Sequence, residues 1–185
     1  MAVTPFALCV ADDATFWAWS SWPRLARWPG KDKALVVMPI AGFYAPSPDS
    51  AWDGEETELT ERLAAASREL GSPEWLLVVP PLRFVAGPDP RCAFAVPPPV
   101  AHAWIEEVAG SIAAAGFRKI LLFNASPWNE EVCAAAARDL HVARDLDLFC
   151  LHLSGLRAAG CPPLSALLRE LGEWERPAPP ERLAP

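Results

Sequence analysis

Apolar runs of strand length, separated by stretches with helical periodicity, constrain the fold of this chain more than any other feature. The runs cover residues 34–40, 75–81, 119–124 and 146–152. Their hydrophobicity is continuous rather than alternating, which is typical of strands buried on both faces. Such strands occur in parallel sheets that are covered by helices on both sides. The pattern therefore predicts an α/β fold.

Helical periodicity fills the intervals between these runs. Leu59, Leu63 and Ala66 recur at helical spacing within residues 55–70, and similar patterns cover residues 99–116, 129–140 and 164–171. Asp53 and Asn129 stand where N-caps are expected. Alternating strands and helices predict a three-layer α/β/α sandwich with a mostly parallel sheet.

The length of the chain sets its domain organisation. A chain of 185 residues can bury one well-packed core but not the cores of two ordinary domains. We expect a single domain over residues 1–172. Residues 173–185 form a proline-rich tail, which we expect to be extended or disordered, or packed on a neighbouring chain.

Composition excludes several classes of partner. The formal net charge is −7 and the 16 Lys and Arg residues are scattered, so a nucleic-acid surface is not expected. No apolar run approaches the roughly 20 residues that a membrane span needs. The N-terminus lacks the basic region of a secretion signal, which favours a cytoplasmic location. The five widely spaced cysteines include no C-x-x-C pair and indicate reduced, mostly buried thiols rather than disulfides or a zinc site.

Two proline-rich loops are the expected location of any ligand site. Residues 43–54 and 83–99 begin at the carboxyl ends of predicted strands, where the ligand sites of open α/β sheets form. Neither loop contains a histidine, and His102, His141 and His152 are isolated in the sequence. Ser126 occupies a strand-to-helix turn, but the residue after it is Pro127, which lacks the N–H that an oxyanion hole requires.

Nine tryptophans are the compositional anomaly, and several of them cluster near the N-terminus. Trp17, Trp19, Trp22 and Trp28 fall within a dozen residues. Large aromatic side chains add contact area at a small cost in rotamer entropy. The cluster either packs an irregular segment onto the sheet or forms an oligomer interface.

Two segments carry a resemblance to a known family. Residues 22–42 (WPRLARWPGKDKALVVMPIAG), followed by residues 116–124 (GFRKILLFN) and a helix that opens at Asn129, resemble the creatininase (creatinine amidohydrolase) family. The similarity spans about residues 22–168. It implies an α/β/α sandwich, two divalent metals such as zinc or manganese, hydrolysis of an amide or cyclic amide, and often a hexamer.

The ligand motifs of that family do not carry over to this sequence. Other residues stand where the family places metal ligands: Tyr44, Pro46, Ser126, Trp128, Leu153 and Ala158. Glu55 at best replaces the bridging aspartate. Hydroxyl, apolar and aromatic side chains cannot build a site for two metals. We therefore expect no metal and no cofactor.

These departures favour a creatininase-like protein that has lost metal-dependent amide hydrolysis. It would act as a non-catalytic scaffold, regulatory or ligand- or partner-binding protein, as a homo-oligomer or with a paralogous subunit. The expected remnant of the site is a cleft lined by Tyr44, Asp49, Trp52, Asp53, Glu55, Asn124, Ser126, Trp128 and Asn129, with aromatic faces that suit a small neutral or cationic ligand.

The alternative is a divergent hydrolase that acts on a small amide or cyclic amide. Its catalytic groups would have moved to other residues, namely Asp49, Asp53, Glu55 or Glu56 with Asn124, Ser126 or Asn129. A weaker version retains amidohydrolase activity through a partner subunit that supplies the metals.

Overall fold

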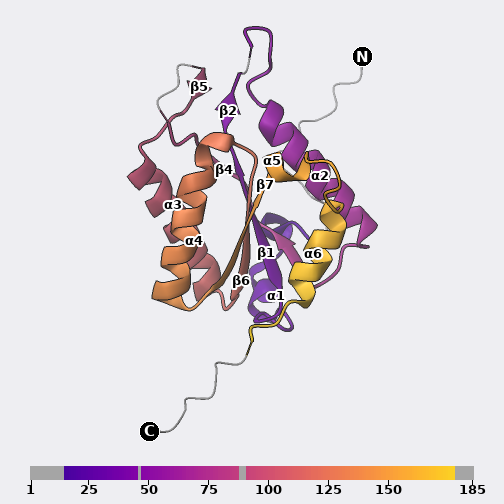
Figure 1. Ribbon diagram of the computed structural model, residues 1–185. Helices are drawn as coiled ribbons and strands as arrows, with labels where there is room; N and C mark the ends of the chain where they lie inside the picture. The colour runs from indigo at the N-terminus through magenta and orange to yellow at the C-terminus, as the bar shows by residue number, and fades with distance from the viewer. Residues whose placement is uncertain (1–14, 46, 88–90, 178–185) are drawn as a thin grey trace, which may run out of the picture.

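The sheet is parallel and lies between two layers of helices. The computed structural model describes residues 15–45, 47–87 and 91–177. Strands β3 (Leu76–Val78), β1 (Leu35–Ala41), β6 (Lys119–Asn124) and β7 (Asp147–His152) pair in that order, and β4 (Leu82–Arg83) also pairs with β1. Helices α3 (Pro98–Ala114) and α4 (Glu130–Arg144) cover one face, and α2 (Gly54–Glu69) and α6 (Leu164–Glu173) cover the other (Figure 1). The predicted α/β/α sandwich is confirmed.

Strand β1 shows why its sequence is apolar throughout. All seven residues of β1 are buried. Val36, Met38 and Ile40 contribute to the core beneath α3 and α4. Leu35 and Val37 contribute to the core beneath α2 and α6. A strand between two helical layers needs hydrophobic side chains in both directions, which removes the alternation that a one-sided sheet would show.

The shorter elements connect this framework. They are the 3-10 helices η1 (Trp17–Trp19) and η2 (Pro127–Asn129), helices α1 (Trp22–Ala26) and α5 (Leu153–Leu156), and strands β2 (Phe43–Tyr44) and β5 (Cys92–Ala93). Strands β2 and β5 pair antiparallel, so the two proline-rich loops are joined to each other. The predicted strand over residues 75–81 is shorter than expected: it covers Leu76–Val78, and the chain returns to β1 as β4.

Asp53 and Asn129 occupy the predicted N-cap positions, but their side chains do not cap the helices. Neither Asp53 before α2 nor Asn129 before α4 makes a side-chain capping hydrogen bond. Gly71 follows α2 with a φ of 71°, in the left-handed region that glycine adopts without strain. At the end of α6, the Lys119 ammonium donates to the carbonyl oxygens of Leu171, Gly172 and Trp174. These bonds satisfy carbonyls that a helix end leaves without partners.

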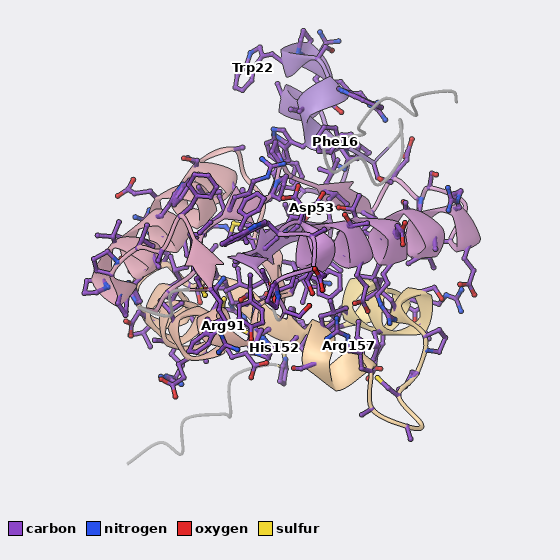
Figure 2. The ribbon with its side chains drawn as sticks, turned by 90° about the horizontal axis from the view of Figure 1, so that it is seen from above. Phe16, Trp22, Asp53, Arg91, His152 and Arg157 are labelled. Carbon is purple, nitrogen blue, oxygen red and sulfur yellow. The ribbon has the colours of Figure 1, made fainter. Side chains whose placement is uncertain are left out.

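The tryptophan cluster divides into buried and exposed members. Trp28 is buried and Trp17 packs against Phe117, with 5.0 Å between ring centroids. Trp19 and Trp22 are 55% and 74% exposed, and Trp22 lies at the outer rim of the molecule in Figure 2. The segment therefore packs on the domain through part of its tryptophans and leaves the others in solvent.

The cysteines are free but less buried than expected. Cys133 is buried, Cys92 and Cys161 are half-buried, and Cys150 is exposed. Cys9 lies outside the described residues. The prediction of free thiols holds for the cysteines that the structure describes, whereas the prediction that they are mostly buried is wrong there.

The beginning of the expected tail contacts the domain. Trp174 packs edge-on against Phe149, with 5.2 Å between ring centroids, and Arg176 binds Asp145 and Asp147. Residues 178–185 lie outside the described part of the chain. Among the described helices, none combines the length and the apolar character that a bilayer span would need.

Candidate site at the carboxyl edge of the sheet

The carboxyl ends of β1, β6 and β7 bring the candidate residues to one edge of the sheet. Asn124 is in register with Ile40 of β1 on one side and with His152 of β7 on the other. The loops that leave these strand ends carry Tyr44 and Ser126, and α2 begins nearby. Figure 2 looks down on this edge, with His152, Arg157 and Asp53 labelled around it.

Asn124 orders the turn that carries Ser126. Its side-chain amide donates to the Ser126 carbonyl at 2.7 Å, and its side-chain oxygen accepts from the Ser126 N–H at 3.2 Å. The same amide nitrogen lies 3.2 Å from Nδ1 of His152. Asn124 is buried, so these bonds are needed to offset its desolvation. The residue therefore positions this turn and the end of β7.

Asn129 fastens the turn to a different loop. Its side-chain oxygen accepts from the Ala86 N–H at 2.8 Å, and its amide donates to the Phe84 carbonyl at 2.9 Å. The side chain is fully buried. It acts as a bridge between η2 and residues 84–86 because the loop after β4 has backbone groups that need partners.

Glu55 and Ser126 form the polar centre of the site. Glu55 lies in the first turn of α2 and points toward the Ser126 hydroxyl and the backbone N–H of Gly42. Yet Glu55 Oε2 and Ser126 Oγ are buried and neither has a hydrogen-bond partner of normal geometry in the described structure. Buried polar atoms without partners are rare and often mark a place where water or a ligand binds.

Burial dominates the electrostatics of Glu55. Desolvation raises the pKa of Glu55 from 4.5 to about 7, against smaller lowering effects of the Ser126 hydroxyl, the Gly42 amide and the Arg157 charge. A carboxyl group with this pKa exchanges its proton near neutral pH. The structure buries one carboxylate oxygen of Glu55 beside the Ser126 turn.

Gly42 allows this close packing. A Cβ atom at this position would lie 2.8 Å from Val85 Cγ2 and 3.0 Å from Ser126 Oγ. Any side chain at Gly42 would therefore push against the Ser126 turn. Sequence reasoning did not select Gly42 as a site residue; its position directly after a buried strand is the signal that could have identified it.

Aromatic rings close one side of the site. The Tyr44 and Trp128 rings are 6.3 Å apart in an edge-to-face arrangement, and Trp128 packs over Gly87. The Arg91 guanidinium lies 5.3 Å from the centre of the Tyr44 ring. A positive side chain of the protein itself therefore occupies one face of Tyr44, which leaves that face unavailable to a cationic ligand.

Other expected residues lie in solvent. Asp49, Trp52 and Asp53 are exposed on the loop that precedes α2. Pro46 lies outside the described residues. The residues that the structure brings together are Tyr44 with Trp128, Glu55 with Ser126, and Asn124 with Ser126.

Charged pairs hold the start of α2 in place. Arg83 donates from Nε and Nη2 to the two carboxylate oxygens of Glu56, at 2.8 and 2.7 Å, and so links α2 to β4. Glu58 binds Arg62 and Arg157, and the hydrogen bonds from Arg157 are the main reason that the pKa of Glu58 is lowered. Sequence reasoning missed Arg157, because its partner Glu58 is distant in the chain.

The donor set does not fit a pair of divalent metals. In the described parts of the chain, no three His, Cys, Asp or Glu side chains come together in an arrangement that could hold a metal ion. Glu55 offers one carboxylate, Ser126 offers a neutral hydroxyl, and His152 turns Nδ1 toward Asn124. Sites for two metals need several carboxylate and imidazole ligands.

Comparison with known proteins supports the fold. No family model matches the sequence, and no curated protein matches it. Solved structures do match. A creatinine amidohydrolase (creatininase) aligns with a TM-score of 0.63 at 14% identity, over 80% of this chain and 61% of that one. A manganese creatininase aligns with a TM-score of 0.63 at 14% identity, over 85% and 63%.

A candidate creatinine amidohydrolase from Bacteroides fragilis aligns with a TM-score of 0.65 at 15% identity, over 80% of this chain and 59% of that one. The chain thus spans about three-fifths of the length of these structures. At such identity the match establishes a creatininase-like fold. The chemistry has to be inferred from the residues at the carboxyl edge.

Proposed function

We propose that this protein has a creatininase-like fold without metal-dependent amide hydrolysis and acts as a non-catalytic scaffold, regulatory or binding protein. The observation that carries the proposal is the composition of the carboxyl edge. One carboxyl group faces one hydroxyl group there, beside aromatic rings, where a hydrolase of this fold would need a set of anionic and imidazole ligands. Within the proposal, residues 1–172 act as one cytoplasmic domain and residues 173–185 as its tail.

The Glu55 and Ser126 oxygens indicate what such a site would bind. Both atoms are buried and lack partners of normal geometry within the described structure. A small neutral molecule with hydrogen-bond donors would satisfy them, and the Trp128 ring, which is 37% exposed, would pack against its apolar part. Because Arg91 already covers one face of Tyr44, a neutral ligand suits the site better than a cationic one.

The second candidate function is a hydrolase with relocated catalytic groups. The raised pKa of Glu55 favours it, because a carboxyl group that titrates near neutral pH can serve as a general base. Ser126 and a bound water are the groups that such a base would reach first. No oxyanion donor follows Ser126, since the next residue is Pro127.

Metal content and amide hydrolysis, measured on the same sample, test the proposal. The protein is loaded with zinc or manganese, desalted and analysed for bound metal, and then assayed with creatinine and simple cyclic amides. We expect well below one metal per chain and no turnover, because the edge offers too few anionic ligands. Glu55→Gln, Ser126→Ala and the exposed control Asp53→Asn are measured beside the unchanged protein.

Two results would contradict the proposal in different ways. One or two metals per chain, lost in Glu55→Gln and retained in Asp53→Asn, would show that a metal site persists. Hydrolysis without metal, abolished in Glu55→Gln and Ser126→Ala, would establish the relocated hydrolase instead.

Self-association is part of the same proposal. Trp19 and Trp22 lie close together in the sequence and are more than half exposed, and exposed apolar side chains that gather in one place mark contact surfaces. We expect light scattering at micromolar concentration to show a dimer or a larger assembly. Trp22→Ser should shift the population toward smaller species, whereas the exposed Val142→Ser on α4 serves as the matched control. A monomer at all concentrations would reject this part of the proposal.

A further inference from the structure

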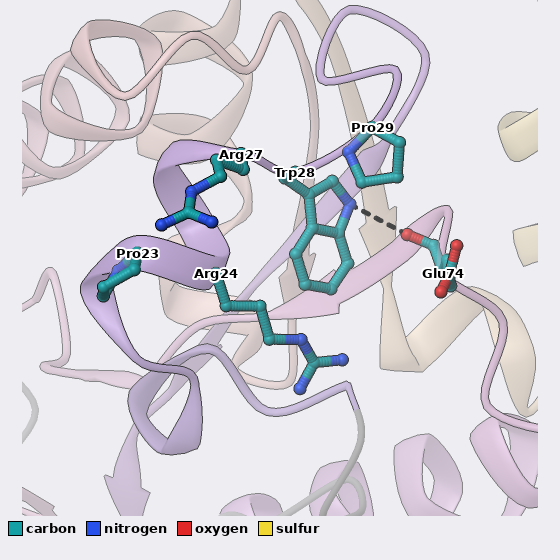
Figure 3. Close-up of a pocket in the computed structure, with 6 residues that line it drawn as sticks. All are labelled: Pro23, Arg24, Arg27, Trp28, Pro29 and Glu74. Atoms are coloured by element: carbon teal, nitrogen blue, oxygen red, sulfur yellow. Dashed lines mark hydrogen bonds between the residues drawn. The ribbon is translucent and has the colours of Figure 1, made fainter.

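A second site lies at the opposite edge of the sheet from Glu55 and Ser126. A cavity of about 300 Å³ is lined by Pro23, Arg24, Arg27, Trp28, Pro29 and Glu74 (Figure 3). Trp28 precedes β1 and Glu74 precedes β3, so the cavity is at the amino ends of these strands. Its volume is at the lower end of the range for small-molecule sites.

Trp28 forms a fixed wall of this cavity. The ring is buried, and its indole N–H donates to the carbonyl oxygen of Glu74 at 2.9 Å. The Arg24 guanidinium lies 5.0 Å from the centre of the ring. A cation held against an indole face has a restricted position, while its N–H groups stay available at the edge of the guanidinium.

The charges around the cavity have no oppositely charged partners among the described residues. Arg24 lies in α1 and Arg27 directly follows that helix, and both are exposed side chains that line the cavity. No ion pair or side-chain hydrogen bond joins either of them, or the Glu74 carboxylate, to another described residue. Elsewhere in the protein, Arg83 pairs with Glu56 and Arg176 pairs with Asp147.

Positive and negative side chains line this one small cavity and do not form ion pairs with each other, which favours a ligand that carries both charges. Two guanidinium groups suit a phosphate or carboxylate group, because their N–H donors match its oxygens. The Glu74 carboxylate would repel a simple anion and attract an ammonium group. We propose that this cavity binds a small zwitterion, with its acidic group between Arg24 and Arg27 and its amino group toward Glu74.

A matched set of probes tests the charge pattern. O-phosphoethanolamine carries both charges, ethyl phosphate carries only the anion, ethanolamine carries only the cation, and β-alanine replaces the phosphate by a carboxylate. Calorimetric titration should show O-phosphoethanolamine binding more tightly than ethyl phosphate or ethanolamine. The comparison with β-alanine decides between the phosphate and the carboxylate as the preferred acidic group.

Removing each charge in turn should change the affinities for the probes in a different way. Arg27→Gln should weaken O-phosphoethanolamine binding by about threefold to fivefold, within the range for an exposed ion pair. Glu74→Gln should weaken O-phosphoethanolamine but tighten ethyl phosphate, since the repulsion is removed while the carbonyl that binds Trp28 remains. Arg138→Gln removes the same charge from α4, which packs beside β7, and should change neither affinity.

The proposal fails if O-phosphoethanolamine does not bind at millimolar concentration. It also fails if Glu74→Gln alters both ligands in the same direction, or if Arg138→Gln weakens binding as much as Arg27→Gln. Urea unfolding of each variant shows that the substituted protein is folded at the temperature of the titration. Because the cavity is remote from Glu55 and Ser126, these results do not depend on the function of the carboxyl edge.

Discussion

Asn129→Ala should lower the free energy of unfolding by about 2–4 kcal/mol. The side chain is fully buried and bridges η2 to the loop after β4, through hydrogen bonds to Phe84 and Ala86. Alanine removes both bonds, which leaves the Phe84 carbonyl and the Ala86 N–H without the partners that Asn129 supplies. For a chain of this size, the loss corresponds to a fall in Tm of roughly 5–15 °C. Urea unfolding monitored by circular dichroism measures it.

Ser126→Ala is the matched control for this prediction. Ser126 belongs to the same turn and is buried to the same degree, but its hydroxyl has no hydrogen-bond partner of normal geometry in the described structure. Its removal should therefore change stability by less than about 1 kcal/mol, since burial of an unpaired hydroxyl is itself unfavourable. Equal losses in the two variants would show that the Asn129 bridge does not hold the loop.

Glu55→Gln should raise stability above neutral pH and leave it nearly unchanged in acid. The pKa of Glu55 is raised from 4.5 to about 7 by burial, so the folded state binds this proton more tightly than the unfolded state. Stability contributed by the protonated form is fully present below pH 4.5 and is lost as the pH rises through 7. Because Glu55 is partly exposed, the expected gain for glutamine at pH 8 is about 1–2 kcal/mol.

The measurement is the difference in unfolding free energy between Glu55→Gln and the unchanged protein at pH 5 and at pH 8. Subtraction cancels the titration of the other groups. Asp53→Asn is the control, since Asp53 is exposed two residues earlier in the chain and its neutralisation should give no comparable pH-dependent difference. A Glu55→Gln difference that stays constant with pH would exclude a raised pKa in the folded protein.

Periodicity was sufficient to predict the sheet and its covering helices, because burial on both faces leaves a continuous apolar run in the sequence. Helix α4 illustrates the limit of local rules. Asn129 stands at the right position for a cap, but backbone groups of residues 84–86 compete for its side chain and bind it. Only the tertiary structure brings that competitor near, so propensity alone gives the wrong role.

The sequence pointed to the carboxyl edge of the sheet and to some of the residues that the structure brings together there. The register between β6 and β7 places Asn124 beside His152. The spacing of these residues along the sequence does not reveal that register. The burial of Glu55 depends on how α2 sits over the Ser126 turn, which is permitted by the missing side chain of Gly42. Strands β2 and β5 have only two residues each, too few for periodicity to be detected.

The position of β1 also determines the order in which the protein can assemble as it is synthesised. β1 is made early, yet its pairing with β3 must wait for Leu76, and its pairing with β6 must wait for Lys119. Contacts so distant in sequence form slowly, because a long loop must close before they provide any stability. Until then, the most apolar strand of the sheet has unpaired edges on a growing chain, which is the condition that recruits chaperones and promotes aggregation.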